Sequence, residues 1–364
     1  MEIRFPKYLN RRLIGTFIAL TFIGILNLFS ASRAVSYDIF QKQVLLVLLG
    51  IAVMAVMVFV DYRFWSRVAY PIYAGALGLL MLVLLAGKVS GGAQRWISFG
   101  GQVFQPSELM KLSIIILLAK FFESREVKEG MRFKNLILSG AIVLIPFFLV
   151  VLQPDLGTAL HTTIGGFAVL LFVGIRVRSL IALSTGAAAI APAAWFFLKD
   201  YQKKRMLSFL NPSMDPLGSG YHIIQSKIAI GSGGIFGKGF LQGTQTQLGF
   251  LPEHYTDFIF STFSEEWGFL GAFIVFALFF IFIITAFDIA VKAKDRFGFL
   301  LASGITFFIS AQLLINLGMV LGLLPVVGIP LPFFSYGRSS LIILMIECAL
   351  LINIDLRKRI FTDL

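Results

Sequence analysis

Four carboxylates gather where a long apolar run begins, in the stretch LPEHYTDFIFSTFSEE at residues 251–266. They are Glu253, Asp257, Glu265 and Glu266, four of only nineteen acidic residues in the chain. Apolar surroundings raise the pKa of a carboxylate, and a raised pKa suits a general base that removes the proton of a hydroxyl group. Asp257 lies at the edge of the apolar run and is therefore a candidate general base.

The spacing of polar residues gives this stretch a second interpretation. Five small or acidic residues recur at helical intervals and would form one polar stripe on a helix otherwise rich in Phe and Ile. They are Asp257, Ser261, Ser264, Glu265 and Gly268. Such a stripe can simply pack against neighbouring helices, and we interpret Glu265 in that way. For Asp257, the spacing leaves both interpretations open.

Another apolar run opens with Pro106, Glu108 and Lys111. Proline suits the first helical position, and a carboxylate in the first turn interacts favourably with the helix dipole. Glu108 and Lys111 are three residues apart, so they share a helix face and can pair. The pair is either a structural ion pair or a cation poised for an anionic group, with the acid setting its position. Asp155 follows Pro154 before a further apolar run, where a helix-start carboxylate is the simpler interpretation.

Three cations are adjacent in YQKKRMLSFLNP, residues 201–212: Lys203, Lys204 and Arg205. They could bind lipid phosphates or a substrate diphosphate, for which arginine offers a bidentate fork. The glycine-rich stretch GSGGIFGKGF at 231–240 lacks the spacing of a phosphate loop and is interpreted as a close-packing turn. The three histidines, His161, His222 and His254, show no metal-ligand spacing, so no protein-built metal site is predicted.

Composition identifies the class of protein that must hold these residues. Of 364 residues, 58% are hydrophobic and 14% charged, with a mean hydropathy of +0.88. Soluble domains have about half their residues apolar and about a quarter charged, so the chain is a polytopic membrane protein. The net charge of +12 comes mostly from residues that fringe apolar runs, which indicates topology and anionic lipids rather than nucleic acid. The single Cys348 excludes an intramolecular disulfide.

Apolar runs predict an all-α fold of about ten transmembrane helices, the first of them uncleaved. The predicted spans are 13–31, 43–60, 68–87, 106–122, 135–152, 156–174, 178–198, 258–287, 298–321 and 339–356. With both termini cytoplasmic, the inside segments hold nineteen Lys and Arg residues and the short outside loops five. Residues 199–257 then form a long outer loop between spans seven and eight. Every candidate residue above falls at the outer side, where the chemistry is expected.

Six stretches, taken in order, resemble the motifs of the SEDS family (shape, elongation, division and sporulation). They are RWISFGGQVFQPSELMK, QPDLGTAL, RMLSFLNPSMDPLGSGYHIIQS, IAIGSGGIFGKG, LPEHYTDFIFSTFSEEWG and PLPFFSYGRSS. The resemblance covers nearly the whole chain, so residues 1–364 are expected to form one domain. It implies a ten-span peptidoglycan glycosyltransferase of the cytoplasmic membrane that polymerises lipid II into nascent glycan on the outer face. It also implies a class B penicillin-binding protein as partner, which crosslinks the product.

The short N-terminus resembles the elongation branch, RodA, more than the division branch, FtsW. The resemblance therefore implies a role in an elongation complex that maintains rod shape. The sequence is also compatible with two other functions: a lipid II flippase, or a non-catalytic scaffold that activates the penicillin-binding protein.

The resemblance also assigns roles to individual residues. Asp257 matches the essential aspartate of the family motif PExHTDF and would take the proton of the attacking sugar hydroxyl. We expect Lys111 and Arg205 to hold the departing undecaprenyl diphosphate, with Glu108 positioning Lys111. Further candidates for substrate binding are Arg95, Asp155 and Lys204. No cofactor is required, although a divalent cation, Mg²⁺ or Mn²⁺, bridging the diphosphate is compatible with this chemistry.

The chain departs from the family pattern at two positions. Tyr255 stands where the family usually has histidine, with His254 one place earlier. Arg338 replaces a glycine of the usual Ser-Tyr-Gly-Gly-Ser-Ser sequence, which adds a cation where backbone freedom is expected.

Overall fold

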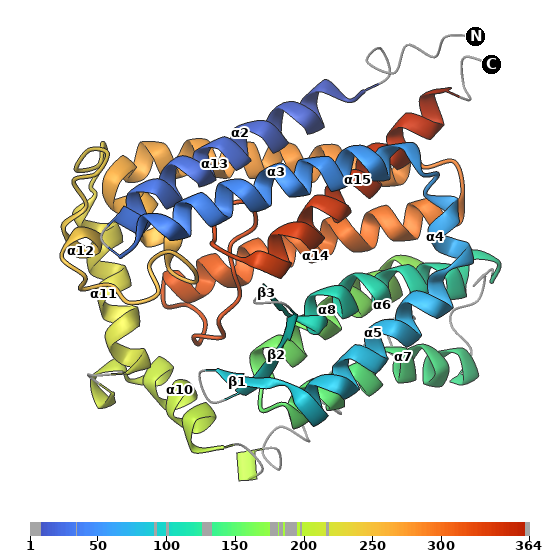
Figure 1. The fold of residues 1–364 in the computed structure, drawn as a ribbon, viewed down its shortest axis with the longest axis horizontal. Coiled ribbons are helices and arrows are strands. Elements are labelled where there is room, and N and C mark those ends of the chain that lie inside the picture. The colour runs from blue at the N-terminus through green and yellow to red at the C-terminus, as the bar shows by residue number, and fades with distance from the viewer. Residues whose placement is uncertain are drawn as a thin grey trace.

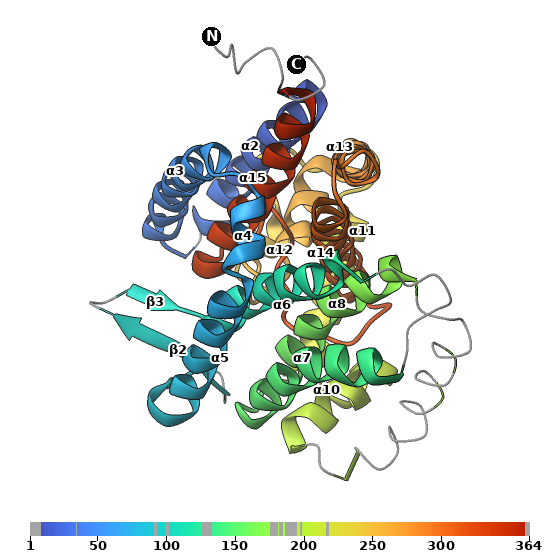
Figure 2. The same ribbon diagram turned by 90° about the vertical axis from the view of Figure 1, so that its right-hand side faces the viewer.

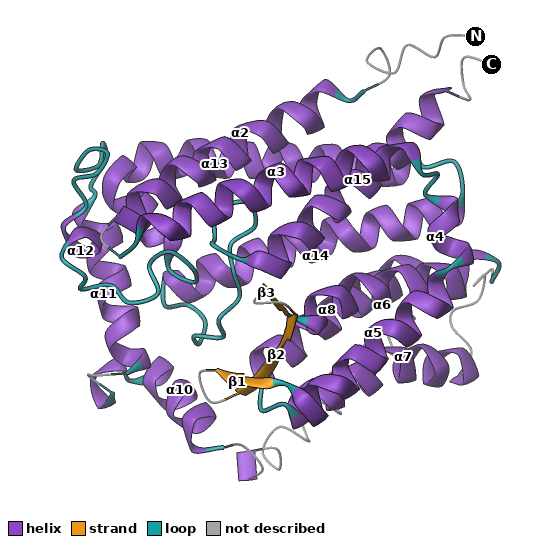
Figure 3. Ribbon diagram, viewed as in Figure 1, coloured by secondary structure: helices purple, strands orange, loops and turns teal. Residues whose placement is uncertain are grey.

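The computed structural model describes residues 9–33, 35–90, 93–99, 102–125, 133–174, 181, 185, 195–196, 199–215 and 218–360. These residues form a bundle of long helices (Figures 1 and 3). The long helices are α2 (Arg11–Arg33), α3 (Tyr37–Phe59), α5 (Ala69–Ala86), α6 (Pro106–Glu123), α7 (Phe133–Leu152), α8 (Leu156–Val173), α13 (Ile259–Val291), α14 (Arg296–Val320) and α15 (Arg338–Ile360). Each overlaps a predicted span, and a short helix, α4 (Arg63–Arg67), precedes α5.

The predicted polytopic, helical membrane fold is confirmed. Within the part of the chain described here, seven helices are long and apolar enough to cross a membrane. Helix α6 is not among them because its 18 residues carry Glu108, Lys111, Lys120 and Glu123. The predicted span at 178–198 falls almost entirely outside the described residues, so the number of ten spans stays a prediction.

Side chains at the helix starts accept hydrogen bonds from backbone amides that lack a partner within the helix. Ser36 accepts from Asp38 N at 3.2 Å before α3, and Asp295 accepts from Gly298 N at 2.8 Å before α14. Asp155 accepts from Thr158 N at 3.1 Å and begins α8, as predicted for a helix-start carboxylate. Pro106 occupies the first turn of α6.

The long helices form two groups that α14 joins (Figure 2). Helices α2, α3, α13 and α15 pack together, and α5, α6, α7 and α8 form the second group. Helix α14 contacts α13 on one side and α6 and α8 on the other. The start of α2 and the end of α15 lie at one end of the bundle (Figure 1). At the opposite end lie α10 (Asp200–Leu210), the 3₁₀ turn η1 (Pro212–Met214), α11 (Ser219–Ser232) and α12 (Thr244–Gln247).

A small antiparallel sheet connects α5 to α6, where no strand was predicted. Its strands are β1 (Lys88–Ser90), β2 (Ala93–Phe99) and β3 (Gln102–Phe104), in that order. Ile97 of β2 pairs with Phe104 of β3, and Lys88 of β1 pairs with Trp96 of β2. The strands are too short to give a clear alternating pattern. Strand β2 carries Arg95, which lines a cavity together with residues of α10.

The glycine-rich stretch after α11 packs directly on α13. The amides of Lys238 and Gly239 donate to the carbonyls of Glu265 and Glu266, each at 3.0 Å. In return, Phe269 N donates to the carbonyl of Gly234 at 2.9 Å. This approach requires Gly268, whose φ of +65° and ψ of −164° interrupt the helix. The stretch is therefore a close-packing turn, as its sequence predicted.

Helix α13 also carries a buried carboxylate, Glu265, that holds this end of the molecule together. Its Oε1 lies 2.6 Å from Lys238 Nζ and accepts from Gln245 N at 3.0 Å, at the start of α12. Glu265 is thus a packing residue, as the sequence suggested.

We expect Gly268→Ala to destabilise the fold. A Cβ at Gly268 would lie 2.3 Å from Gly237 N, and the positive φ disfavours any side chain. These effects together should cost at least about 2 kcal/mol. Gly75→Ala in α5 is the matched control, since a Cβ there meets nothing within 4 Å. Thermal unfolding in detergent should show a lower midpoint for G268A alone; equal midpoints would contradict the role given to Gly268.

Candidate active site

Asp257 lies in a turn before α13 rather than on the helix. Helix α13 begins at Ile259, and Gly268 interrupts it, so the predicted stripe from Asp257 to Gly268 is not one continuous helical face. The interpretation of Asp257 as a member of a packing stripe is therefore wrong. Its surroundings come instead from a distant segment, the loop between α14 and α15.

Three consecutive carbonyls attach the Asp257 turn to that loop and to α14. Tyr255 O accepts from Tyr336 N at 2.9 Å. Thr256 O accepts from the hydroxyl of Ser335 at 2.6 Å. Asp257 O accepts from Asn316 Nδ2 at 2.9 Å. The backbone that carries the candidate base is thereby fixed at each residue.

The carboxylate of Asp257 lies against the backbone of the same loop. A Cβ built at Gly328 would lie 3.3 Å from Asp257 Oδ2, and Gly328 has a φ of +73°. Burial raises the pKa of Asp257 to about 6, helped by the negative charge of Glu253. Arg205 and Arg95 oppose this shift in the pKa through their positive charges. Asp257 therefore has the raised pKa that a general base for a hydroxyl needs.

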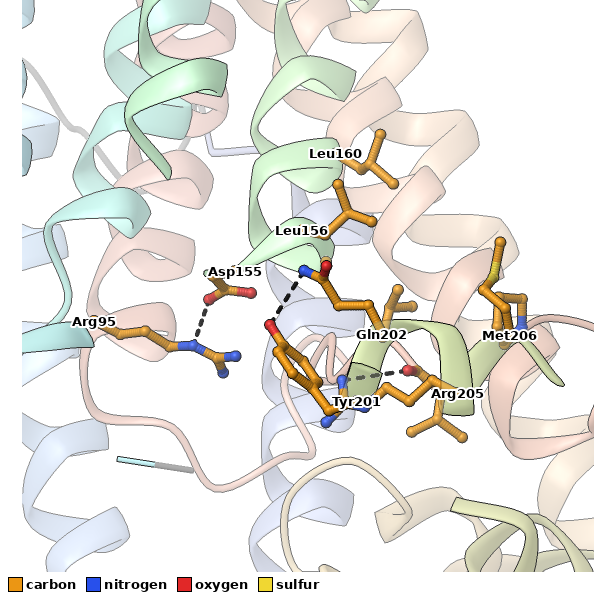
Figure 4. A pocket seen from close by; sticks show the side chains of 12 residues that line it. Arg95, Asp155, Leu156, Leu160, Tyr201, Gln202, Arg205 and Met206 are labelled. Carbon is orange, nitrogen blue, oxygen red and sulfur yellow. Dashed lines mark hydrogen bonds and ion pairs between the residues drawn. The ribbon is translucent and has the colours of Figure 1, made fainter. Parts of the chain in front are cut away.

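A cavity of about 110 Å³ lies beside this loop (Figure 4). Val326 and Val327 line it together with Arg95, Asp155 and Arg205, which come from β2, the start of α8 and α10. Gly328 directly follows Val327. One short segment therefore lines the cavity through Val327 and lies against Asp257 through Gly328. The structure thus brings together four of the residues predicted from sequence, each at least 50 positions from the next: Arg95, Asp155, Arg205 and Asp257.

The two arginines of the cavity are held differently. Arg95 Nε lies 2.7 Å from Asp155 Oδ2, and Asp155 is buried (Figure 4). Arg205 donates to the carbonyl of Val326 at 3.4 Å, and its guanidinium lies 5.8 Å from the ring centre of Tyr201. Among the described contacts Arg205 has no carboxylate partner, so most of its five N–H donors are available to an anion.

Lys111 and Glu108 lie inside the helix bundle and do not line this cavity. They form the predicted ion pair, with Lys111 Nζ 2.7 Å from Glu108 Oε1. Lys111 is only 1% exposed; its ammonium lies 3.3 Å from His161 Nδ1 and 5.6 Å from the ring centre of Phe308. A role of the pair in binding substrate stays a prediction.

Other residues singled out from sequence lie in the Asp257 turn, at the start of α15 and on α10. His254 is buried, with Nε2 3.0 Å from Ala31 O, so it ties the turn to α2. Tyr255 places its ring edge-on to Tyr336, with centroids 6.3 Å apart. Arg338 begins α15 and donates to the hydroxyl of Tyr336 at 3.3 Å. Lys204, next to Arg205, is exposed.

Sequence reasoning missed Asn316 and Gly328, the two residues that touch Asp257 from the other segment. A signal was present, since Asn316 is a polar residue within an apolar span and Gly328 interrupts the apolar stretch LLPVVGIP. Polar residues inside a membrane segment usually have a function. Nothing local, however, relates these positions to Asp257, which lies 59 and 71 places earlier in the chain.

Comparisons with known proteins identify the family. The family model FtsW/RodA/SpoVE, described as a cell cycle protein, matches residues 10–360. The chain belongs to this family. The motif resemblance to SEDS proteins is thereby confirmed.

Curated relatives match over nearly their whole length. Peptidoglycan glycosyltransferase MrdB of Escherichia coli strain K12 is 38% identical over 356 residues, which cover 98% of this chain and 95% of the relative. A probable peptidoglycan glycosyltransferase FtsW of Geobacter metallireducens is 38% identical over 357 residues, covering 94% and 93%.

Two solved structures share the fold. One is a chain from work on the structural coordination of polymerization and crosslinking by a peptidoglycan synthase complex. It has a TM-score of 0.82 and 35% identity, and the match covers 95% of this chain and 97% of that one. The other is the rod shape determining protein RodA of Thermus thermophilus, with a TM-score of 0.72, 30% identity and coverage of 95% and 96%.

Proposed function

We propose that this protein is a peptidoglycan glycosyltransferase that polymerises lipid II, with Asp257 as the general base. Two observations on the Asp257 turn carry the assignment. Its three backbone carbonyls at 255–257 are held by hydrogen bonds, and the carboxyl of Asp257 has a raised pKa and interacts with the charges of two arginines. The two relatives above, both named as peptidoglycan glycosyltransferases, support the reaction class.

The reaction requires one proton acceptor and one anion-binding group. The oxygen of the acceptor sugar's 4-hydroxyl forms a bond to the anomeric carbon of the donor, and its proton passes to the carboxylate of Asp257. The bond between that carbon and the undecaprenyl diphosphate breaks, and the diphosphate leaves with the electron pair. In-line displacement inverts the anomeric configuration, so base and leaving group lie on opposite sides of the carbon. Fixed cations stabilise the charge that develops on the diphosphate.

Arg205 is the cation best placed to receive the diphosphate. It lines the cavity and lies close enough to Asp257 to affect its pKa, while its own contacts are a carbonyl and a tyrosine ring. Arg95 shares the cavity but is paired with Asp155, which we assign to positioning Arg95. Exposed Lys204 adds positive charge at the rim, and buried Lys111 with Glu108 would act only if substrate reached the bundle interior.

No step requires a cofactor. A divalent cation, Mg²⁺ or Mn²⁺, would act by bridging oxygens of the diphosphate itself. The positive-inside rule places the site on the outer side of the cytoplasmic membrane, where lipid II and membrane lipids are accessible. We infer a class B penicillin-binding protein as partner, within an elongation complex, since one solved relative comes from a peptidoglycan synthase complex.

Replacing the proposed base tests the function directly. In purified protein with labelled lipid II and the partner transpeptidase, Asp257→Asn should reduce polymerisation below about 1% of wild type, since general bases contribute roughly 10²–10⁴-fold. Asp288→Asn is the control, because Asp288 lies near the far end of α13 and forms an exposed pair with Lys292. Full activity of folded D257N would refute the assignment. Translocation without polymer would indicate a flippase, and partner activation alone a scaffold.

The raised pKa of Asp257 predicts how polymerisation depends on pH. The base works only when ionised, and its pKa is about 6. Activity should therefore fall as pH drops through about 6, approaching a tenfold loss per pH unit below that value. Initial rates of polymerisation between about pH 4.5 and 8 measure this limb. A rate that stays constant down to about pH 4.5 would exclude a titrating base of this kind.

Variants of two neighbouring cations on α10 distinguish diphosphate binding from a general effect of surface charge. Arg205→Ala should lower the polymerisation rate by about 10²-fold, as loss of one preorganised donor does. Lys204→Ala, next in sequence but exposed, should change it by no more than about twofold, as expected of a screened surface charge. Equal losses in both variants would mean that α10 acts only through its net charge.

A further inference from the structure

Asn316 connects the Asp257 turn to the loop that faces it. The residue is 0% exposed in α14, and its Nδ2 donates to two carbonyls, Asp257 O at 2.9 Å and Ile329 O at 2.8 Å. Both partners are acceptors, so both amide hydrogens are used and the flipped amide would not serve. One side chain thus fixes two segments that are 72 positions apart in sequence.

This connection determines what touches the carboxylate. Ile329 directly follows Gly328, the residue whose added Cβ would lie 3.3 Å from Asp257 Oδ2. Holding Ile329 next to the backbone of Asp257 therefore holds Gly328 against its side chain. The same loop lines the cavity through Val326 and Val327.

We propose that Asn316 is a positioning residue, which presses the loop at 326–329 against Asp257 and so limits the access of water to the carboxylate and fixes its direction. The inference rests on the proposed function of Asp257 as the base. Asn316 touches only backbone, so it acts through Asp257 and not on the substrate.

The α14 side of Asp257 carries no charged group that could shift the pKa of its carboxyl. The charged groups that act on it are Glu253 of its own segment, Arg205 of α10 and Arg95 of β2. His222 of α11 stacks on the adjacent Phe258, with ring centroids 5.8 Å apart. Residues 297–335, which include most of α14 and the facing loop, contain no charged residue or histidine. Any effect of the α14 side on the pKa of Asp257 therefore comes through burial, the largest cause of the shift, and not through charge.

The test compares Asn316→Leu and Asn316→Ser with Gln312→Leu. Gln312 lies one turn earlier on α14 and donates to Pro330 O at 2.8 Å, so it anchors the same loop without touching Asp257. Loosening the loop at Asn316 should admit water, lower the pKa of Asp257 and weaken it as a base. We expect both Asn316 variants to lose about 10- to 100-fold in kcat with little change in KM for lipid II. Their acid limb should move to lower pH by about one unit, while Q312L keeps the wild-type limb.

Each outcome has a separate meaning. An acid limb that stays at the wild-type pH in folded N316L and N316S, whatever their rate, would overturn the positioning role. The same shift in Q312L would assign the effect to the loop in general and would also overturn it. N316S keeps the test open if N316L fails to fold, because the smaller side chain avoids overpacking. D257N, measured alongside, judges the base itself: if it stays active, the proposed function fails independently of Asn316.

Discussion

Three consecutive backbone carbonyls, those of residues 255–257, determine where the candidate base lies. A carbonyl taken out of water without a donor costs free energy comparable to a lost hydrogen bond, and each of these three accepts a hydrogen bond from a distant segment. The donors come from α14 and from the loop before α15: an asparagine amide, a serine hydroxyl and a backbone amide. The turn and the loop therefore have one relative position in which all three are paired. This relative position places Gly328 and the loop that lines the cavity next to Asp257 and contributes to the burial that raises its pKa.

The charged residues of the candidate site form two groups, one around the cavity and one inside the bundle. The groups differ in how their charges are paired. Around the cavity, Asp155 neutralises Arg95, whereas the contacts of Arg205 with described residues are a carbonyl and a tyrosine ring. An arginine with unused donors near a carboxylate of raised pKa is suited to this reaction. The carboxylate can accept a proton while the arginine binds the departing diphosphate. Inside the bundle, Lys111 is already neutralised by Glu108 and enclosed by His161 and Phe308. A buried pair of this kind is costly to separate, which favours a structural role in the observed arrangement.

Glycines make the approach of the loops possible. Gly268 and Gly328 both have positive φ, and an added Cβ at Gly268 or Gly157 would lie within 2.5 Å of backbone atoms. Gly157 faces the carbonyl of Val327, so the loop at 325–328 is enclosed between α8 and Asp257. The segment that lines the cavity is thus confined by close backbone contacts on two sides. A confined loop is suited to hold a small site in constant geometry.

The sequence by itself determined the class of the protein, nearly every helix, the family and the identity of the candidate base. Hydropathy reports the membrane because about 20 apolar residues are needed to cross it, and helix starts follow local rules that Pro106 and Asp155 obey. The pairing of Glu108 with Lys111 was also predictable, since it depends only on helical spacing. Only the tertiary structure decided that Asp257 lies off its helix, that Arg205 and not Lys111 lines the cavity beside the facing loop, and that Asn316 and Gly328 support Asp257. These facts depend on contacts between segments far apart in the chain, and neither spacing nor composition records such contacts.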